Sequence, residues 1–160
     1  MRRITTIAIG AIMAATVSGA GLAAASASPA RSGTEHVQLI STSQNRYAVI
    51  AYGLFTGHGV DLSGAKVDTI KFANGSFQIT HGPGKGPQSF DPKTCLLLVR
   101  QHGTYTIGHG TGAYRGITGN GKYQVSIVAV GAKSGGRCSQ SKPLAAFQVV
   151  IDASGPVSLR

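Results

Sequence analysis

Asp68 and His81 are the two residues of this chain that come nearest to an acid–base pair. They flank Asn74-Gly75, which lies between two runs of alternating apolar and polar residues and predicts a hairpin with a two-residue type I′ turn. That turn sets Asp68 opposite His81 on one face of the hairpin. At the mouth of a barrel such a pair can transfer protons. At the rim of a sheet it is an ordinary cross-strand ion pair, which is the interpretation we favour.

The same register predicts which side chains of the hairpin are buried. Phe72 opposes Phe77 and Ile70 opposes Ile79, while the polar residues between them point to the other face. We expect the apolar face to be buried and to line the interior if the sheet closes on itself. The predicted lining residues are Ile70, Phe72, Phe77 and Ile79.

The surrounding sequence or the spacing of the residues excludes the other catalytic and cofactor motifs. Gly119-Asn120-Gly121-Lys122 has glycines beside a lysine, but a strand follows it instead of the helix that a phosphate-binding loop needs. The histidines include no pair spaced i, i+2 or i, i+4, and no serine stands in a G-x-S-x-G elbow. We therefore predict no metal and no cofactor, and the catalytic residues, if there are any, are unknown.

Cys95 and Cys138 are the two cysteines of the chain. An even count in a protein that is exported to an oxidising compartment favours a disulfide over free thiols. A bridge between them closes a long loop and is expected to stabilise the fold by about 4 kcal/mol on the loop-entropy model.

The first 27 residues have the pattern of a secretory signal peptide. Arg2 and Arg3 precede an apolar stretch, residues 4–17, and Ala25-Ser26-Ala27 is a small-residue cleavage site. The stretch is shorter than the about 20 residues that span a bilayer. We predict cleavage after Ala27, no transmembrane segment and a secreted, extracellular product. Residues 28–35 are predicted to be a flexible mature N-terminus, and residues 36–160 a single domain.

Positive charge is concentrated in the C-terminal half of the chain. Between Lys93 and Ile151 there are seven basic residues and no acidic residue. The charges stand singly, without the clustering and interleaved aromatics of a nucleic-acid groove, so we predict no nucleic-acid partner. An anionic polymer of the cell envelope is one candidate partner, and simple solubility is the alternative. The seven residues are Lys93, Arg100, Arg115, Lys122, Lys133, Arg137 and Lys142.

The pattern after residue 35 is that of strands throughout, because no window keeps a helical apolar period for more than about two turns. Glycine and proline crowd residues 81–92, which we predict to be a long exposed loop, and residues 131–142 are predicted to be a polar loop. An all-β, eight-stranded antiparallel up-and-down barrel accounts for this pattern and leaves no exposed edge. The predicted strands are 36–42, 46–57, 66–73, 76–81, 93–101, 103–108, 121–130 and 144–152.

The glycine-rich stretch GTGAYRGITGNG resembles the G-x-G-x-[FY]-x-G-x-x-G-x-G pattern of the allene oxide cyclase and dirigent proteins. The wider layout, from Tyr47 to Ile151, is also similar to a group of small secreted actinobacterial proteins of unknown function. The resemblance implies a calycin-like barrel in which Tyr114 and Ile117 help to close one end. It also implies that the glycines permit the bend into a strand near Gly121, and it assigns no catalytic residue. The motif glycines are Gly110, Gly112, Gly116, Gly119 and Gly121.

Three functional hypotheses follow. The first is a secreted, non-enzymatic barrel that binds a small apolar ligand, which requires an interior cavity of at least about 300 Å³. The second is a cyclase or isomerase that acts by confining its substrate, which requires a deep pocket with a buried titratable group. The third is a binder of anionic envelope polymers, which requires the basic residues of the C-terminal half to lie on one face.

Overall fold

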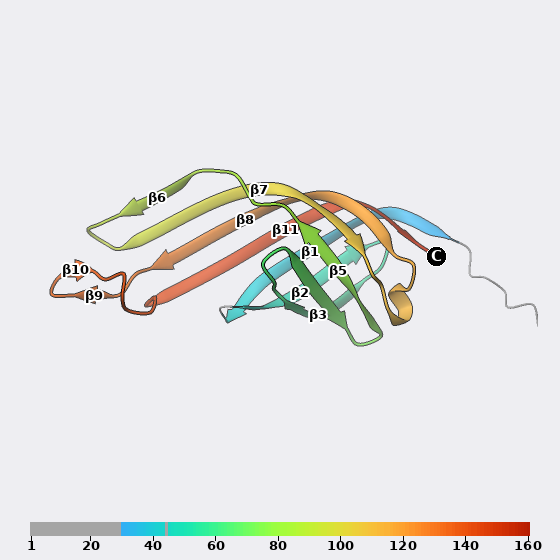
Figure 1. Cartoon of the computed structure of the whole chain (residues 1–160), viewed down its shortest axis with the longest axis horizontal. Helices are drawn as coiled ribbons and strands as arrows, with labels where there is room; N and C mark the ends of the chain where they lie inside the picture. The colour runs from blue at the N-terminus through green and yellow to red at the C-terminus, as the bar shows by residue number, and fades with distance from the viewer. Residues whose placement is uncertain (1–29, 44) are drawn as a thin grey trace, which may run out of the picture.

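Eight antiparallel strands close into an up-and-down barrel (Figure 1). The computed structural model describes residues 30–43 and 45–160, so the predicted signal peptide and its cleavage site lie outside the described residues. Closure comes from the pairing of β5 with β7, from Gln78 opposite Gly108 to His81 opposite Tyr105. The predicted fold class is thereby confirmed. The strands of the ring are β1 (Arg31–Ser43), β2 (Arg46–Gly53), β3 (Gly57–Leu62), β4 (Val67–Phe72), β5 (Gly75–His81), β7 (Leu96–Gly108), β8 (Thr118–Val130) and β11 (Ala146–Leu159).

The predicted number of strands is right because two boundary errors cancel. The predicted strand 46–57 is in fact broken after Gly53, whose φ of 133° turns the chain out of β2 and toward β3. The predicted strands 93–101 and 103–108 are one strand, β7. Gly103 does not turn the chain. It pairs with Tyr123, and a Cβ on it would come within 2.5 Å of the tyrosine ring.

The barrel takes in residues that were predicted to be flexible. β1 begins at Arg31, not at residue 36, because residues 31–35 pair with the last residues of β11, which runs on to Leu159. The prediction of a flexible segment is therefore wrong for residues 31–35, and residues 28–29 lie outside the described part. Glu35, at the end of that segment, is fully buried.

The hairpin between β4 and β5 turns one residue earlier than predicted. Ala73 and Asn74 are its two central residues and Phe72 opposes Gly75, so Asn-Gly does not form a type I′ turn. A distant segment of the chain explains the shift: the amide of Ala113 donates to the carbonyl of Asn74 at 2.9 Å, which draws the turn toward the glycine-rich stretch. Moving the turn by one residue shifts the cross-strand partner of each residue by two positions, so every side chain keeps its predicted face. Ile70, Phe77 and Ile79 are buried in the core cluster and Phe72 packs against it.

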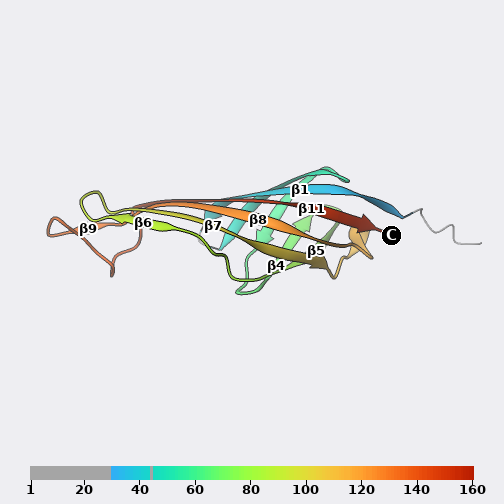
Figure 2. The same cartoon turned by 90° about the horizontal axis from the view of Figure 1, so that it is seen from above.

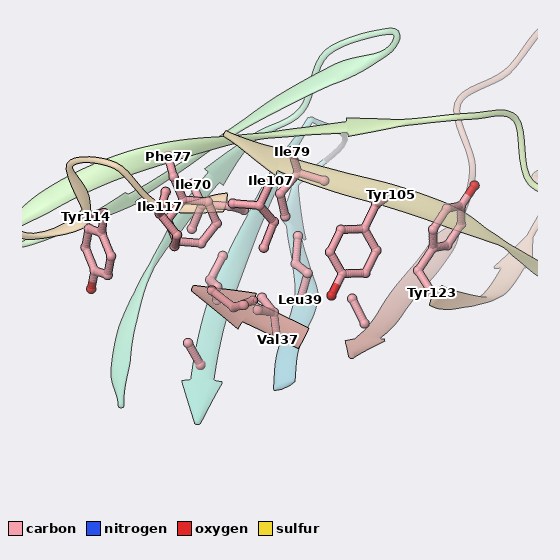
Figure 3. Close-up of a cluster of buried hydrophobic side chains, with 14 residues drawn as sticks. Val37, Leu39, Ile70, Phe77, Ile79, Tyr105, Ile107, Tyr114, Ile117 and Tyr123 are labelled. Carbon is pink, nitrogen blue, oxygen red and sulfur yellow. The ribbon is translucent and has the colours of Figure 1, made fainter. Parts of the chain in front are cut away.

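One end of the barrel is closed by aromatic rings. A 3-10 turn, η1 (Gly112–Tyr114), places the Tyr114 ring with its centroid 5.0 Å from that of Phe55, 5.1 Å from that of Phe72 and 5.5 Å from that of Phe77. Ile117, three residues on, is 1% exposed. We call this the closed end. Figure 3 shows Tyr114 and Tyr123 at opposite ends of the buried cluster.

A single layer of sheet extends beyond the other end of the barrel (Figures 1 and 2). Part of the predicted loop 81–92 forms β6 (Gln88–Asp91), which pairs with the start of β7. On the other edge, β1 pairs with β11 only from Val150 onward, so the preceding residues of β11 continue past the barrel. We call this region the distal sheet: β6 with residues 96–99 of β7, 127–130 of β8 and 146–149 of β11.

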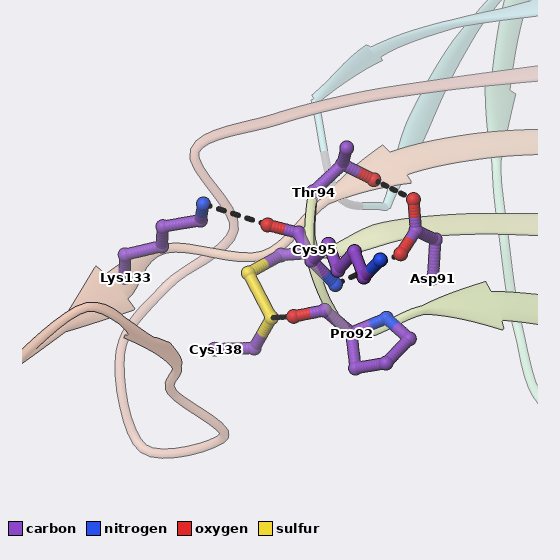
Figure 4. The surroundings of a disulfide bond; sticks show 7 residues. Asp91, Pro92, Thr94, Cys95, Lys133 and Cys138 are labelled. Carbon is purple, nitrogen blue, oxygen red and sulfur yellow. Dashed lines mark hydrogen bonds between the residues drawn. A yellow bond between two sulfur atoms is a disulfide. The ribbon is translucent and has the colours of Figure 1, made fainter.

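The predicted disulfide is confirmed. Cys95, at the start of the distal sheet, is bonded to Cys138 across a sequence separation of 43 residues (Figure 4). Cys138 belongs to the loop after β8, which contains a two-stranded ribbon of β9 (Lys133–Ser134) and β10 (Arg137–Cys138). We call residues 131–145 the distal loop. The disulfide ties this loop to the far end of the molecule.

Candidate ligand-binding site

A cavity of about 210 Å³ opens at the end of the barrel opposite Tyr114. β5 runs from the closed end at Gly75 to this mouth at His81, and the segment from Gly82 to Gly84 lies over it. The hydroxyl of Tyr123 donates to the carbonyl of Gly82 at 2.8 Å, which fixes that segment across the opening. The apolar wall of the cavity is Leu39, Ile79, Val125 and Ile151, and its polar side chains include Asp68, His81, Gln101 and Tyr105.

Asp68 and His81 lie side by side in this mouth. Nε2 of His81 is 3.4 Å from Oδ2 of Asp68, and the two side chains are 27% and 14% exposed. Because Asp68 opposes Ile79 in the hairpin, the two residues are diagonal neighbours and not directly opposite as predicted. The other carboxylate oxygen of Asp68 accepts the amide of Gly64 at 2.9 Å. Asp68 therefore both orders the turn between β3 and β4 and presents charge to the cavity.

Asp61 is a buried acid that the sequence analysis missed. It is 1% exposed, and neither carboxylate oxygen has a hydrogen-bond partner. Burial, together with the nearby charge of Asp68, raises the pKa of Asp61 to about 7. Tyr47, its cross-strand neighbour, has a pKa raised by burial and by the same two carboxylates. The alternation of residues 57–62 places Asp61 inside, but only once β3 is recognised as a separate strand.

Glu35 is the second buried acid, and its contacts are structural. Oε2 accepts the amide of Phe55 at 3.1 Å, which holds the bend between β2 and β3, while Oε1 has no partner. Burial raises the pKa of Glu35, although hydrogen bonds from the backbone of Phe55 and Leu54 oppose the rise. The hydroxyl of Tyr105 is also buried without a partner, and burial and the charge of Glu35 raise its pKa.

The titratable groups do not converge on one point. Asp68, His81 and Tyr105 line the mouth cavity, whereas Asp61 and Glu35 lie outside its lining. Within residues 30–43 and 45–160, no three histidine, cysteine, aspartate or glutamate side chains are grouped so that they could hold a metal ion. The arrangement offers hydrogen-bond acceptors beside an apolar wall, which is the composition of a ligand pocket.

The seven basic residues of the C-terminal half are divided over the molecule. Lys93 and Lys133 meet at the distal end, where Nζ of Lys133 donates to the carbonyl of Lys93 at 2.7 Å, and two more belong to the distal loop. Arg115 follows η1 at the closed end. Arg100 and Lys122 are on the barrel strands β7 and β8. The third hypothesis therefore lacks the single basic face that it requires, although the distal end holds a group of four.

No protein-family model matches this chain, and comparisons with curated proteins and with solved structures give no match either. Among the residues that the structure describes, no helix has the length and apolar character needed to cross a membrane.

Proposed function

We propose that this chain is a non-enzymatic binding protein that takes one end of a mainly apolar ligand into the barrel mouth. The observation that carries the proposal is the composition of the mouth cavity, in which the Asp68–His81 pair faces an apolar wall. The cavity is smaller than the about 300 Å³ expected for a whole drug-sized ligand. Core side chains such as Ile70 and Phe77 fill the barrel beyond it, so the ligand enters by one end only.

The rest of the ligand has an apolar path to follow. Side chains of one strand alternate between faces, so Val125 in the cavity is followed on the same face by Ile127 and then Ala129. Across the ladder, Ile127 neighbours Val99 and Val149, and Ala129 neighbours Leu97 and Phe147. The inner face of the distal sheet thus continues the apolar wall of the cavity, and it suits an elongated ligand.

The polar end of the ligand is expected to be a hydrogen-bond donor. The carboxylate of Asp68 only accepts hydrogen bonds. A protonated amine or a hydroxyl satisfies this group, whereas a carboxylate is repelled. The ligand class is therefore an apolar molecule with an amine or hydroxyl at one end.

The cyclase or isomerase alternative has weaker support. It requires a buried titratable group inside a deep pocket. Tyr105 is a buried titratable group in the lining of the mouth cavity, but the two buried acids, Asp61 and Glu35, lie outside that lining. A relationship to the allene oxide cyclase and dirigent proteins remains part of the proposal. The up-and-down topology and the packing of Tyr114 and Ile117 at one end support it.

Export is also proposed. The N-terminal pattern of Arg2, Arg3 and a small-residue cleavage site supports it. The Cys95–Cys138 disulfide is compatible with an extracellular location.

Calorimetric titration with octylamine, octanol and octanoate tests the binding proposal. We expect octylamine and octanol to bind and octanoate not to bind. Asp68→Asn is expected to weaken octylamine binding roughly tenfold, the scale of one hydrogen bond to a charged group. Asp152→Asn, which changes an exposed acid on β11, is the matched control.

A steric variant separates binding in the mouth from adsorption elsewhere. Ala153→Leu adds a side chain to the cavity lining, and Ala48→Leu makes the same change on the exposed face of β2. We expect only the first to abolish binding. Equal binding by both variants, or equal affinity for all three probes, would contradict the proposal. Circular dichroism of each variant verifies that the barrel is folded.

A further inference from the structure

The distal end of the molecule combines exposed apolar side chains with unpaired cations. A second cavity, of about 640 Å³, lies between the distal sheet and the distal loop. Phe90 and Leu144 line it and remain 55% and 47% exposed, and Arg137 and Lys142 belong to the same lining. Leu98 and Val128, on the other face of the distal sheet, are 41% and 43% exposed. Both faces of this single layer therefore carry exposed apolar side chains.

The charge at this end is mainly positive. None of Lys93, Lys133, Arg137 and Lys142 lies within 4.0 Å of a carboxylate in the part of the chain that the structure describes. One acid, Asp91, lies close by, and its oxygens accept the amide of Lys93 at 2.8 Å and the hydroxyl of Thr94 at 2.7 Å (Figure 4). Four cations outnumber this single carboxylate. The cations are therefore available to an anionic partner.

The loop that carries these groups is held in place. The Cys95–Cys138 bond ties it to β7, and the amide of Ser139 donates to the carbonyl of Ala132 at 2.8 Å. The amide of Gly131 donates to the carbonyl of Cys95 at 2.9 Å. Phe90 and Leu144 are thus presented on a fixed scaffold beside the cations, and they are not the tips of a loose segment.

We propose that the distal end docks on an anionic lipid bilayer, with the cations against the headgroups and the exposed apolar side chains in the interface. A bilayer offers both the charge and the apolar phase that such a surface needs. A soluble polyanion would neutralise the cations but leave Phe90, Leu144 and Leu98 in water. A second copy of the chain would bring like charges together if the distal ends met. This proposal uses no residue of the mouth cavity, although Leu97, on the path proposed for the rest of the ligand, also lines the second cavity. The variants that test it lie outside the mouth cavity.

Sedimentation with vesicles tests the proposal. We expect the full chain to bind vesicles that contain phosphatidylglycerol, not to bind phosphatidylcholine vesicles, and to be released by salt. Arg137→Gln with Lys142→Gln should weaken binding about 30-fold, which corresponds to about 1 kcal/mol for each cation near the surface. Arg115→Gln with Lys122→Gln removes the same charge from the barrel and is the control, expected to bind like the unchanged chain.

The apolar contribution distinguishes the bilayer from a polyanion. Phe90→Ser and Leu144→Ser change exposed residues, so both variants should fold. We expect each to weaken vesicle binding while leaving the salt-dependent binding of heparin unchanged. The proposal is overturned if heparin competes fully with vesicles and the serine variants bind vesicles normally. It is also overturned if the two charge pairs have equal effects, or if the serine variants act only by abolishing self-association in sedimentation velocity.

Discussion

The ring of Tyr123 lies over Gly103, its partner across the β7–β8 ladder, so closely that the glycine has no room for a side chain. Two residues along the ladder the roles are reversed: Tyr105 pairs with Gly121, where a Cβ would come within 2.6 Å of the tyrosine hydroxyl. Each tyrosine fills the inner space that the opposite glycine leaves. Both tyrosines line the mouth cavity, so the two pairs shape the candidate site.

Gly103→Ala is expected to destabilise the protein by about 2 kcal/mol, the range for forcing an extra methyl group into a packed core. The free energy of unfolding in urea measures the effect. Gly108→Ala is the control, because a Cβ at Gly108 on the same strand meets nothing within 4 Å. An equal loss of stability in the two variants would show that strand propensity, and not contact with the Tyr123 ring, accounts for the effect of Gly103→Ala.

Gly112→Ala is expected to loosen the closed end. The φ of Gly112 is +57° and a Cβ there would collide with the carbonyl of Asn74, so the variant is strained twice over. Because Gly112 begins η1, we expect greater exposure of Tyr114 and a loss of about 1–3 kcal/mol of stability. Tyrosine fluorescence and urea unfolding report the two effects. Gly135→Ala is the control: Gly135 also has a positive φ, but a Cβ there meets nothing within 4 Å, so this variant measures the loss of stability from backbone strain alone.

Asp61 makes stability depend on pH. Its pKa is raised from 3.8 to about 7, so the folded state holds a proton that the unfolded state has lost. The free energy of unfolding should therefore fall as the pH rises from about 4 to about 7, by up to about 4 kcal/mol, and then level off. In Asp61→Asn this contribution is absent, so the variant should gain stability relative to the unchanged chain at pH 8 but not at pH 4. A difference between the two proteins that is the same at both pH values would contradict the prediction.

Reduction of the Cys95–Cys138 disulfide is expected to lower stability by about 4 kcal/mol on the loop-entropy model. The local effect should be confined to the distal loop. Amide hydrogen exchange of Gly131 and Ser139, whose amides donate to Cys95 and Ala132, should speed up in the reduced protein. Amides of the β2–β3 ladder serve as the control, and equal loss of protection there would show that the bond supports the whole barrel.

Particular residues show why some of the fold is predictable from sequence. Period-two alternation places Phe72 and Phe77 on one buried face in both the predicted and the observed register, because the two registers differ by two residues and such a shift changes no face. The all-β class and the disulfide follow from equally local signals, namely apolar period and cysteine count. The register itself is not local, because the contact between Asn74 and Ala113 sets it from a distant segment.

The amino-acid sequence by itself determined that this protein is a meander of antiparallel strands with one apolar side, since strand periodicity and turn residues act over a few neighbours. Only the tertiary structure decided that Gly103 lies under the ring of Tyr123 and that Asp61 and Glu35 are buried. It also decided that β7, β8 and β11 extend beyond the barrel as a single layer of sheet. Those features depend on which strand lies beside which and on how far each pair extends. The neighbours of each strand and the length of each pairing are set when the barrel closes, so no short stretch of sequence encodes them.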